Sequence, residues 1–141
     1  MSKIASEQES QVSMNIALWT IQVLLAAIYG TIGFREVFQT EKLREQMVWA
    51  KGESSGSLRF VGISELLGAT CMILPLQTGS VPWLVPLAAI GFALIQFLAI
   101  ITVHVPRNDY NILPLNVILL ALSIFVVVGR WPWLISSFHI L

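Results

Sequence analysis

The chain has 141 residues, of which 56% are apolar and only 11% carry a charged side chain. An ordinary soluble domain has about 25% charged residues, so this composition cannot cover a water-facing surface. Eight basic and eight acidic side chains cancel to a formal net charge of zero, which excludes the basic face of a nucleic-acid-binding protein. The composition therefore predicts a single-domain integral membrane protein with the lipid bilayer as its partner.

A polar tail precedes the first apolar segment. Residues 1–15 contain no apolar run long enough for the core of a secretory signal peptide. From Ile16 to about Phe34 the chain is almost continuously apolar, close to the roughly 20 residues that a membrane-spanning helix needs. We therefore expect a tail over residues 1–15 and a retained first span over about residues 16–34.

Most of the charged residues lie between this span and the next. In the first part of this segment, charged side chains lie opposite apolar ones that recur at roughly helical spacing, namely Val37, Phe38, Leu43, Met47 and Val48. This pattern predicts an amphipathic helix in the membrane interface. A flexible run rich in glycine and serine, residues 52–57, then leads to the second span.

Three more apolar segments follow, over about residues 60–76, 82–105 and 112–129. Their continuous apolarity, without the alternation of barrel strands, predicts helices. Short polar connections at residues 77–80 and 106–111 make neighbouring helices antiparallel. The sequence thus predicts an all-α integral membrane four-helix bundle with up-and-down topology over residues 16–131, followed by a short interfacial tail over residues 132–141.

An ionisable side chain inside a span is costly in lipid and indicates a functional site by default. Glu65 lies within the second span, on the same helix face as Gly62. Small residues let another helix approach, so this face should point into the bundle. In an up-and-down bundle, the end of the third span brings His104 to the same half. We expect Glu65 and His104 to form an acid/base pair, with Arg35 and Arg59 as alternative partners of Glu65.

Polar side chains on the other spans extend this cluster. Tyr29 belongs to the first span, Gln96 to the third and Asn116 to the fourth. With the two arginines, they are expected to form a polar cluster or ligand cavity. One interpretation is structural, a buried polar network that fixes helix register. The other is a site in which Glu65 exchanges protons with His104 or with a bound ligand.

The sequence specifies neither a metal site nor a cofactor. A metal site needs three or four ligands, and the chain has two histidines, one of them (His139) in the tail. The single cysteine, Cys71, excludes an intrachain disulfide and a redox dithiol. No haem-binding motif occurs either.

Several short motifs occur in a characteristic order between residues 16 and 131. They are Arg59-Phe60-Val61-Gly62-x-x-Glu65-Leu66-x-Gly68, Leu74-Pro75, Pro82, Ala88-Ala89-x-Gly91, Thr102-Val103-His104 and Gly129-Arg130. This order resembles the DoxX-like family of small four-helix membrane proteins. Family members often have a glycine followed three residues later by a lysine at the end of the first span, whereas here the basic residue is Arg35.

The resemblance implies a link to membrane redox systems, because the family is named after a subunit of a thiosulfate:quinone oxidoreductase. The first functional hypothesis is therefore an accessory or scaffolding subunit of a membrane system, with a membrane or redox protein as its partner. A quinone-linked redox system is the example that the resemblance suggests. The resemblance favours the bacterial inner membrane, with an organellar membrane as the alternative.

Two other hypotheses remain open. The second is a binder of, or an enzyme acting on, a lipophilic small molecule such as a quinone, terpenoid or sterol-like compound, with Glu65 as acid or base. The third is a small transporter built as a homo-oligomer, because the small-residue pairs Ala26/Gly30 and Ala89/Ala93 suit helix association. Whether the protein is an enzyme stays undecided among these hypotheses.

Overall fold

The computed structural model describes residues 1–138, apart from the side chain of Leu76, so the predicted tail position His139 lies outside the described residues. Its elements are α1 (Ser2–Phe38), α2 (Thr40–Gln46), α3 (Val48–Lys51), α4 (Ser55–Thr78), α5 (Leu84–Ala99), the π-helix η1 (Ile100–His104) and α6 (Leu113–Phe138). Helices α1, α4, α5 with η1, and α6 are long and apolar enough to span a membrane. The predicted all-α membrane fold with four spans is confirmed.

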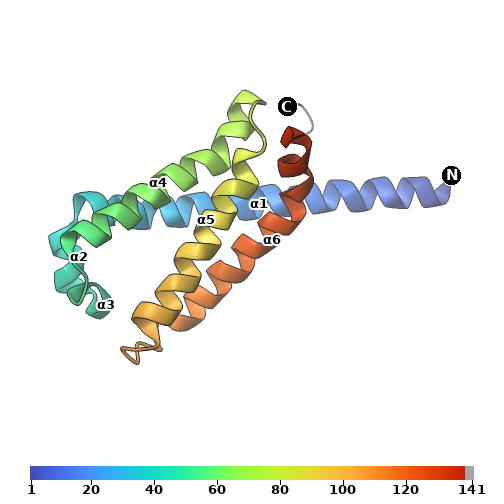
Figure 1. The fold of residues 1–141 in the computed structure, drawn as a ribbon. Helices are drawn as coiled ribbons and strands as arrows, with labels where there is room; N and C mark the ends of the chain where they lie inside the picture. Colours follow the sequence, from blue (N-terminus) through green and yellow to red (C-terminus); the bar gives the residue numbers. More distant parts are fainter. Residues whose placement is uncertain (139–141) are drawn as a thin grey trace.

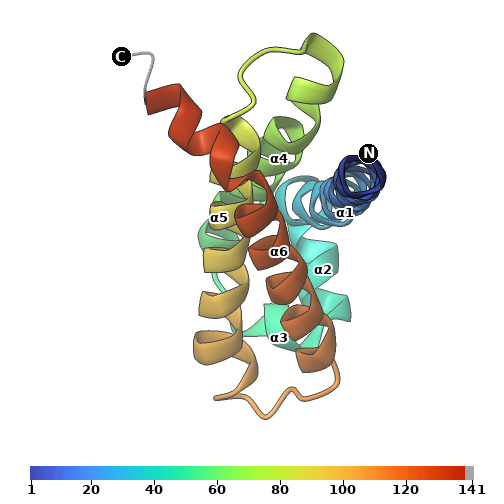
Figure 2. The same cartoon turned by 90° about the vertical axis from the view of Figure 1, so that its right-hand side faces the viewer.

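The long helices pack as two antiparallel pairs, α1 with α4 and α5 with α6. Figure 1 shows α1 running across the α5/α6 pair at a steep angle. Figure 2 shows the same crossing from the side, with α1 seen nearly end-on. The core lies where the pairs cross, and at its centre the rings of Tyr29 and Phe92 stack with centroids 3.7 Å apart.

Two helices extend beyond the predicted spans. Helix α1 begins at Ser2, so residues 1–15 are mostly helical and project from the bundle (Figure 1). No glycine or proline occurs between residues 2 and 29, so nothing in the sequence ends the helix there. Helix α6 continues through Pro132 to Phe138, which makes the described part of the predicted C-terminal tail helical.

The connections on either side of α5 are short, as the sequence predicts. Helix α4 ends at Gly79, whose φ of 63° is the left-handed conformation that glycine adopts readily at a helix C-terminus. The chain then turns directly into α5. At its C-terminal end, α5 continues into the wider π-helix η1, after which the Val105 amide donates to the Ile100 carbonyl oxygen over 3.0 Å.

The charged segment after α1 forms two short helices, because Met47 adopts an extended conformation between α2 and α3. Leu43 and Ala50 pack with Leu58 of α4 in a small second core. The amphipathic pattern is confirmed for Leu43, whereas Phe38 and Val48 are 68% and 71% exposed. The segment therefore caps one end of the bundle.

Candidate functional site

Helices α1 and α4 cross at two glycines. A Cβ atom placed on Gly33 would lie 2.6 Å from the Gly62 carbonyl oxygen, and one placed on Gly62 would lie 2.8 Å from the Gly33 carbonyl oxygen. The two backbones are thus in direct contact, which a side chain at either position would prevent. The expectation that the Gly62 face of the second span points into the bundle is confirmed.

A glutamate follows each glycine by three residues and lies beside the opposite helix. Glu36 packs its Cβ against Gly62, and Glu65 packs its Cβ against Gly33. Both glutamates are 3% exposed, and the Oε2 atom of each has no hydrogen-bond partner. Among the described residues, neither carboxyl group has a cationic nitrogen within 4.0 Å. Two unpaired carboxyl groups therefore flank the helix crossing.

A cavity of about 500 Å³ lies between the two helix pairs and is capped by α2 and α3. Its wall is mainly apolar and draws on α1, α4, α5, η1 and α6. The buried polar residues in this wall are Glu36, Gln96, His104 and Asn116. A small-molecule site typically has a volume of roughly 300–1,000 Å³, with an apolar wall and a few polar groups, and this cavity fits that description.

Two oxygen atoms in the cavity wall have no hydrogen-bond partner. They are Glu36 Oε2 and Gln96 Oε1, in side chains that are 3% and 5% exposed. A buried polar atom without a partner costs about 1–3 kcal/mol. A molecule that donates hydrogen bonds to these oxygens would recover that free energy, so the wall is suited to a ligand.

The structure gives His104 a different partner from the one expected. Its Nδ1 atom lies 3.5 Å from Asp109 Oδ2, in the loop after η1, and its ring meets Trp49 edge-on with centroids 6.3 Å apart. The predicted pair of Glu65 with His104 is not formed. Glu65 packs beside Gly33 at the α1/α4 crossing, outside the wall of the cavity that His104 lines.

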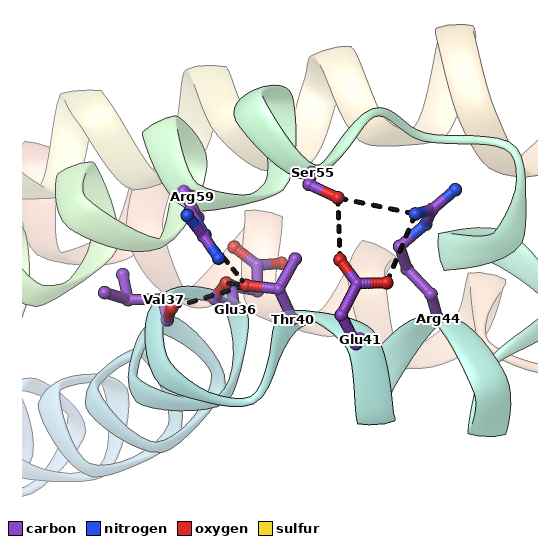
Figure 3. A network of polar contacts seen from close by, with 7 residues as sticks. All are labelled: Glu36, Val37, Thr40, Glu41, Arg44, Ser55 and Arg59. Atoms are coloured by element: carbon purple, nitrogen blue, oxygen red, sulfur yellow. Dashed lines mark hydrogen bonds and ion pairs between the residues drawn. The ribbon is translucent and has the colours of Figure 1, made fainter.

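The two arginines do not reach Glu65 either. Arg35 Nη2 donates to Gln46 Oε1 over 3.1 Å, and Arg59 Nε donates to Thr40 Oγ1 over 3.4 Å (Figure 3). Both guanidinium groups bond to polar groups just after α1 and so stay near the solvated end of the helix, where a charge costs little. The alternative pairings of Glu65 with Arg35 or Arg59 are therefore absent from the structure.

The same end of the bundle is held together by further polar contacts. Figure 3 shows Ser55 at the start of α4 donating to Glu41 Oε1 over 2.9 Å, with Arg44 beside both. On the other side, Arg107 donates to the Trp49 carbonyl oxygen and, over 2.6 Å, to Glu53 Oε1. These contacts fasten α2, α3 and the loop before α6 around the cavity.

The structure brings some of the predicted site residues together and not others. His104, Arg35, Gln96 and Asn116 line the cavity. The other predicted positions lie outside its wall, namely Glu65, Tyr29 and Arg59. The Tyr29 hydroxyl lies near Gln96 and Ser123 without a hydrogen bond.

The sequence interpretation did not name Glu36 as a site residue, although Glu36 follows Arg35 at the end of the first span, in the half of the bundle where the polar cluster was expected. One signal was available: the spacing Gly33-x-x-Glu36 repeats in Gly62-x-x-Glu65. Two such pairs on crossing helices place each glutamate beside the opposite glycine.

A second buried polar cluster lies at the opposite end of the bundle, around Arg130 of α6. Arg130 Nε donates to Gln22 Oε1 and Nη1 donates to Asn15 Oδ1, each over 2.7 Å. Its guanidinium carbon lies 5.0 Å from the Trp19 ring centroid and 4.0 Å from that of Trp133. Only Nη2 has no partner. This cluster joins α1 to α6.

Comparison with known proteins agrees with this architecture. The profile of the DoxX-like family matches residues 20–126, which include parts of all four spans. No significant match was found among curated proteins or among solved structures. Because the family match covers most of the chain, the protein belongs to the DoxX-like family, as a membrane protein with four apolar helices.

Proposed function

We propose that this DoxX-like protein binds a lipophilic small molecule in the cavity between its two helix pairs. The observation that carries the proposal is the combination of a mainly apolar cavity of about 500 Å³ with two buried, unpartnered oxygens in its wall. Apolar walls favour a hydrophobic body, and a few polar groups fix its orientation. Quinones, terpenoids and sterol-like compounds belong to this class.

The cavity wall reaches the lipid-facing surface of the bundle. Phe60 and Leu98 line the cavity, and they are also 73% and 52% exposed on membrane-spanning helices. A hydrophobic molecule dissolved in the bilayer therefore meets the cavity without crossing water. This position supports a ligand taken directly from the membrane.

The role that the sequence suggested for Glu65 fits Glu36 better. Glu36 and His104 both line the cavity, and His104 has Asp109 beside it. Any proton exchange with a bound molecule would use a carboxyl group in the wall, because a proton donor or acceptor must lie within hydrogen-bond reach. Glu36 is therefore our candidate acid or base.

Filling the cavity tests this proposal. Ala99 lines the cavity, so Ala99→Trp places an indole in it, whereas Ala121→Trp adds the same side chain at an exposed position on α6. Each protein is purified gently from native membranes, and its small molecules are extracted and quantified by mass spectrometry. We expect a stoichiometric lipophile in the wild type and Ala121→Trp proteins that is lost from Ala99→Trp. Equal amounts in all three proteins would contradict the proposal.

The second candidate function is a scaffolding role in a membrane system, such as a quinone-linked redox complex. The observation that favours it is the first part of α1, which projects from the bundle with exposed apolar side chains such as Ile4 and Val12 (Figure 1). Deletion of residues 2–12 should remove a copurifying membrane protein if this segment holds a partner. Following the family resemblance, we place either function in the bacterial inner membrane.

A further inference from the structure

We infer that Asp109 is a positioning residue that orients His104, so that the Nε2 atom of its imidazole ring exchanges a proton with the molecule bound in the cavity. The inference rests on the proposed function and adds a second acid/base group to Glu36. His104 ends η1, which continues α5, whereas Glu36 belongs to α1. Because the cavity lies between the two helix pairs, a molecule in it has a titratable group on each side.

The loop after η1 brings Asp109 back to His104. The Asp109 amide donates to the His104 carbonyl oxygen over 3.0 Å. Asn108 has a φ of 54°, in the left-handed region that asparagine enters more readily than most residues. The Tyr110 hydroxyl donates to Asn108 Oδ1 over 3.0 Å. Main-chain and side-chain contacts therefore fix this turn, which leaves the Asp109 side chain only 12% exposed.

The two ring nitrogens of His104 have different surroundings. Nδ1 is buried 3.5 Å from Asp109 Oδ2, and neither atom has a hydrogen bond to another group. Nε2 is not buried and has no hydrogen bond to any described residue. Since His104 lines the cavity, Nε2 is the nitrogen that is open to it. The Trp49 ring meets the imidazole edge-on, with centroids 6.3 Å apart, and limits its rotation.

The contact between His104 and Asp109 suits proton exchange. A small rotation would shorten the distance between Nδ1 and Oδ2 to the roughly 2.7–3.2 Å of a hydrogen bond. When the Nδ1 proton is directed at the carboxyl group, Nε2 is the nitrogen that gains or loses a proton. An imidazolium formed in this way has the aspartate beside it to stabilise its charge. The proton moves between Nε2 and the bound molecule, so atoms and charge balance without an oxidant or a reductant.

The other charged side chains around the cavity have different surroundings. Glu53 pairs with Arg107 over 2.6 Å, and Arg35 donates to α2. Among the described residues, no cationic nitrogen lies within 4.0 Å of the Glu36 carboxyl group. Of Glu36 and His104, only His104 therefore has a partner for its charged form. A buried charge is tolerated when it is paired.

Carbethoxylation tests whether Nε2 is open to the cavity. Diethyl pyrocarbonate acylates an accessible imidazole nitrogen, and mass spectrometry of peptides detects the product at His104. Four samples of the full chain are compared in the same detergent: wild type as purified gently from native membranes, lipid-stripped wild type, and lipid-stripped Ala99→Trp and Ala121→Trp. His104 should react in stripped wild type and Ala121→Trp. With the cavity filled by the new indole or by a copurified lipophile, the reaction should be about tenfold slower, because only molecules with an empty cavity react.

Nitrogen-15 NMR tests the role of Asp109. The chain has two histidines, so a His139→Gln background leaves His104 as the only source of imidazole signals. Under alkaline conditions, where the ring is neutral, we expect the proton on Nδ1. Asp109→Asn should move it to Nε2, whereas Glu45→Gln, at an exposed position of α2, should not. Asp109→Glu keeps the carboxyl group, should restore part of the Nδ1 form, and replaces Asp109→Asn if that variant does not fold.

The outcomes separate this inference from the proposed function. Equal reaction of His104 in all four samples would overturn the inference, because Nε2 would then face away from the cavity. An unchanged proton position in both Asp109 variants would overturn the positioning role. Identical imidazole signals in stripped protein and in protein that retains a lipophile would overturn proton exchange. If no lipophile copurifies but Ala99→Trp still protects His104, the proposed function fails and the geometry of His104 stands.

Discussion

Two buried polar clusters lie at opposite ends of the bundle, and they differ in how well their atoms are satisfied. At one end, two nitrogens of Arg130 donate to Gln22 and Asn15 over 2.7 Å, and two indole rings lie beside the guanidinium group. At the other end, Glu36 and Gln96 present unpartnered oxygens to a cavity. The first cluster leaves only the Nη2 atom of Arg130 without a partner, whereas neither oxygen named in the second cluster has one.

This difference separates two meanings of a polar residue inside a membrane span. A polar group that is paired within the protein stabilises the contact between helices. A polar group that is buried without a partner lowers stability, and a binding site is where such a cost is tolerated. Substitutions in the two clusters should therefore differ in their effect on stability.

The largest effect is expected at Arg130. Arg130→Met removes two charge-assisted hydrogen bonds and leaves the Oε1 atom of Gln22 unpaired inside the bundle, whereas Asn15 is exposed. The free energy of unfolding should fall by about 3 kcal/mol, as measured by titration with denaturing detergent. Arg130→Lys keeps the positive charge, so its free energy of unfolding should fall by less. A loss below about 1 kcal/mol in Arg130→Met would show that the cluster does not hold α1 to α6.

The second largest loss of stability is expected at the crossing of α1 and α4, where Gly33 meets Gly62. In Gly33→Ala, the added Cβ would lie 2.6 Å from the Gly62 carbonyl oxygen, so the helices must separate. Overpacking of this kind costs about 1–3 kcal/mol, and the same detergent titration measures it. Gly91→Ala is the control, because a Cβ there has no atom within 4 Å. If the two variants are equally stable, the close contact between α1 and α4 at Gly33 does not contribute to stability.

A smaller effect of opposite sign is expected at Glu36. Because its Oε2 atom has no partner, Glu36→Met removes a buried polar group that the protein does not satisfy. The free energy of unfolding should stay the same or rise by about 1 kcal/mol. A fall as large as that of Arg130→Met would mean that Glu36 is a paired structural group.

The smallest effect on stability is expected at Arg107. Its ion pair with Glu53 is partly exposed, and such a pair contributes about 0–1 kcal/mol. Arg107→Ala should nevertheless loosen α3 over the cavity and speed the exchange of a bound lipophile, followed through the fluorescence of Trp49. Lys42→Ala, which removes an exposed cationic side chain of α2, should leave the exchange rate unchanged. Equal rates in both variants would exclude α3 as a cover.

The spans and the inward face of Gly62 were predictable, because they depend on apolar length and on the spacing of small residues along one helix. The partner of His104 was not, because the up-and-down topology assigns His104 only to one half of the bundle and does not determine which side chain it meets there. The cavity position of Glu36 depends on how two helices cross, which the spacing within either helix does not determine. The sequence interpretation put Glu65 at the centre of the polar cluster, whereas the carboxyl group of Glu36 lines the cavity.

If Glu36 belongs to a ligand site and Arg130 to the structural contact between α1 and α6, substitution of Glu36 should affect binding and leave stability unchanged. The most direct test quantifies the copurified lipophile per protein molecule in Glu36→Met, beside the wild type, after gentle purification, together with the free energy of unfolding of the lipid-stripped proteins. We predict that Glu36→Met loses the lipophile and keeps its stability. A variant that retains the lipophile in full, or that unfolds as readily as Arg130→Met, would contradict a ligand-binding role of Glu36.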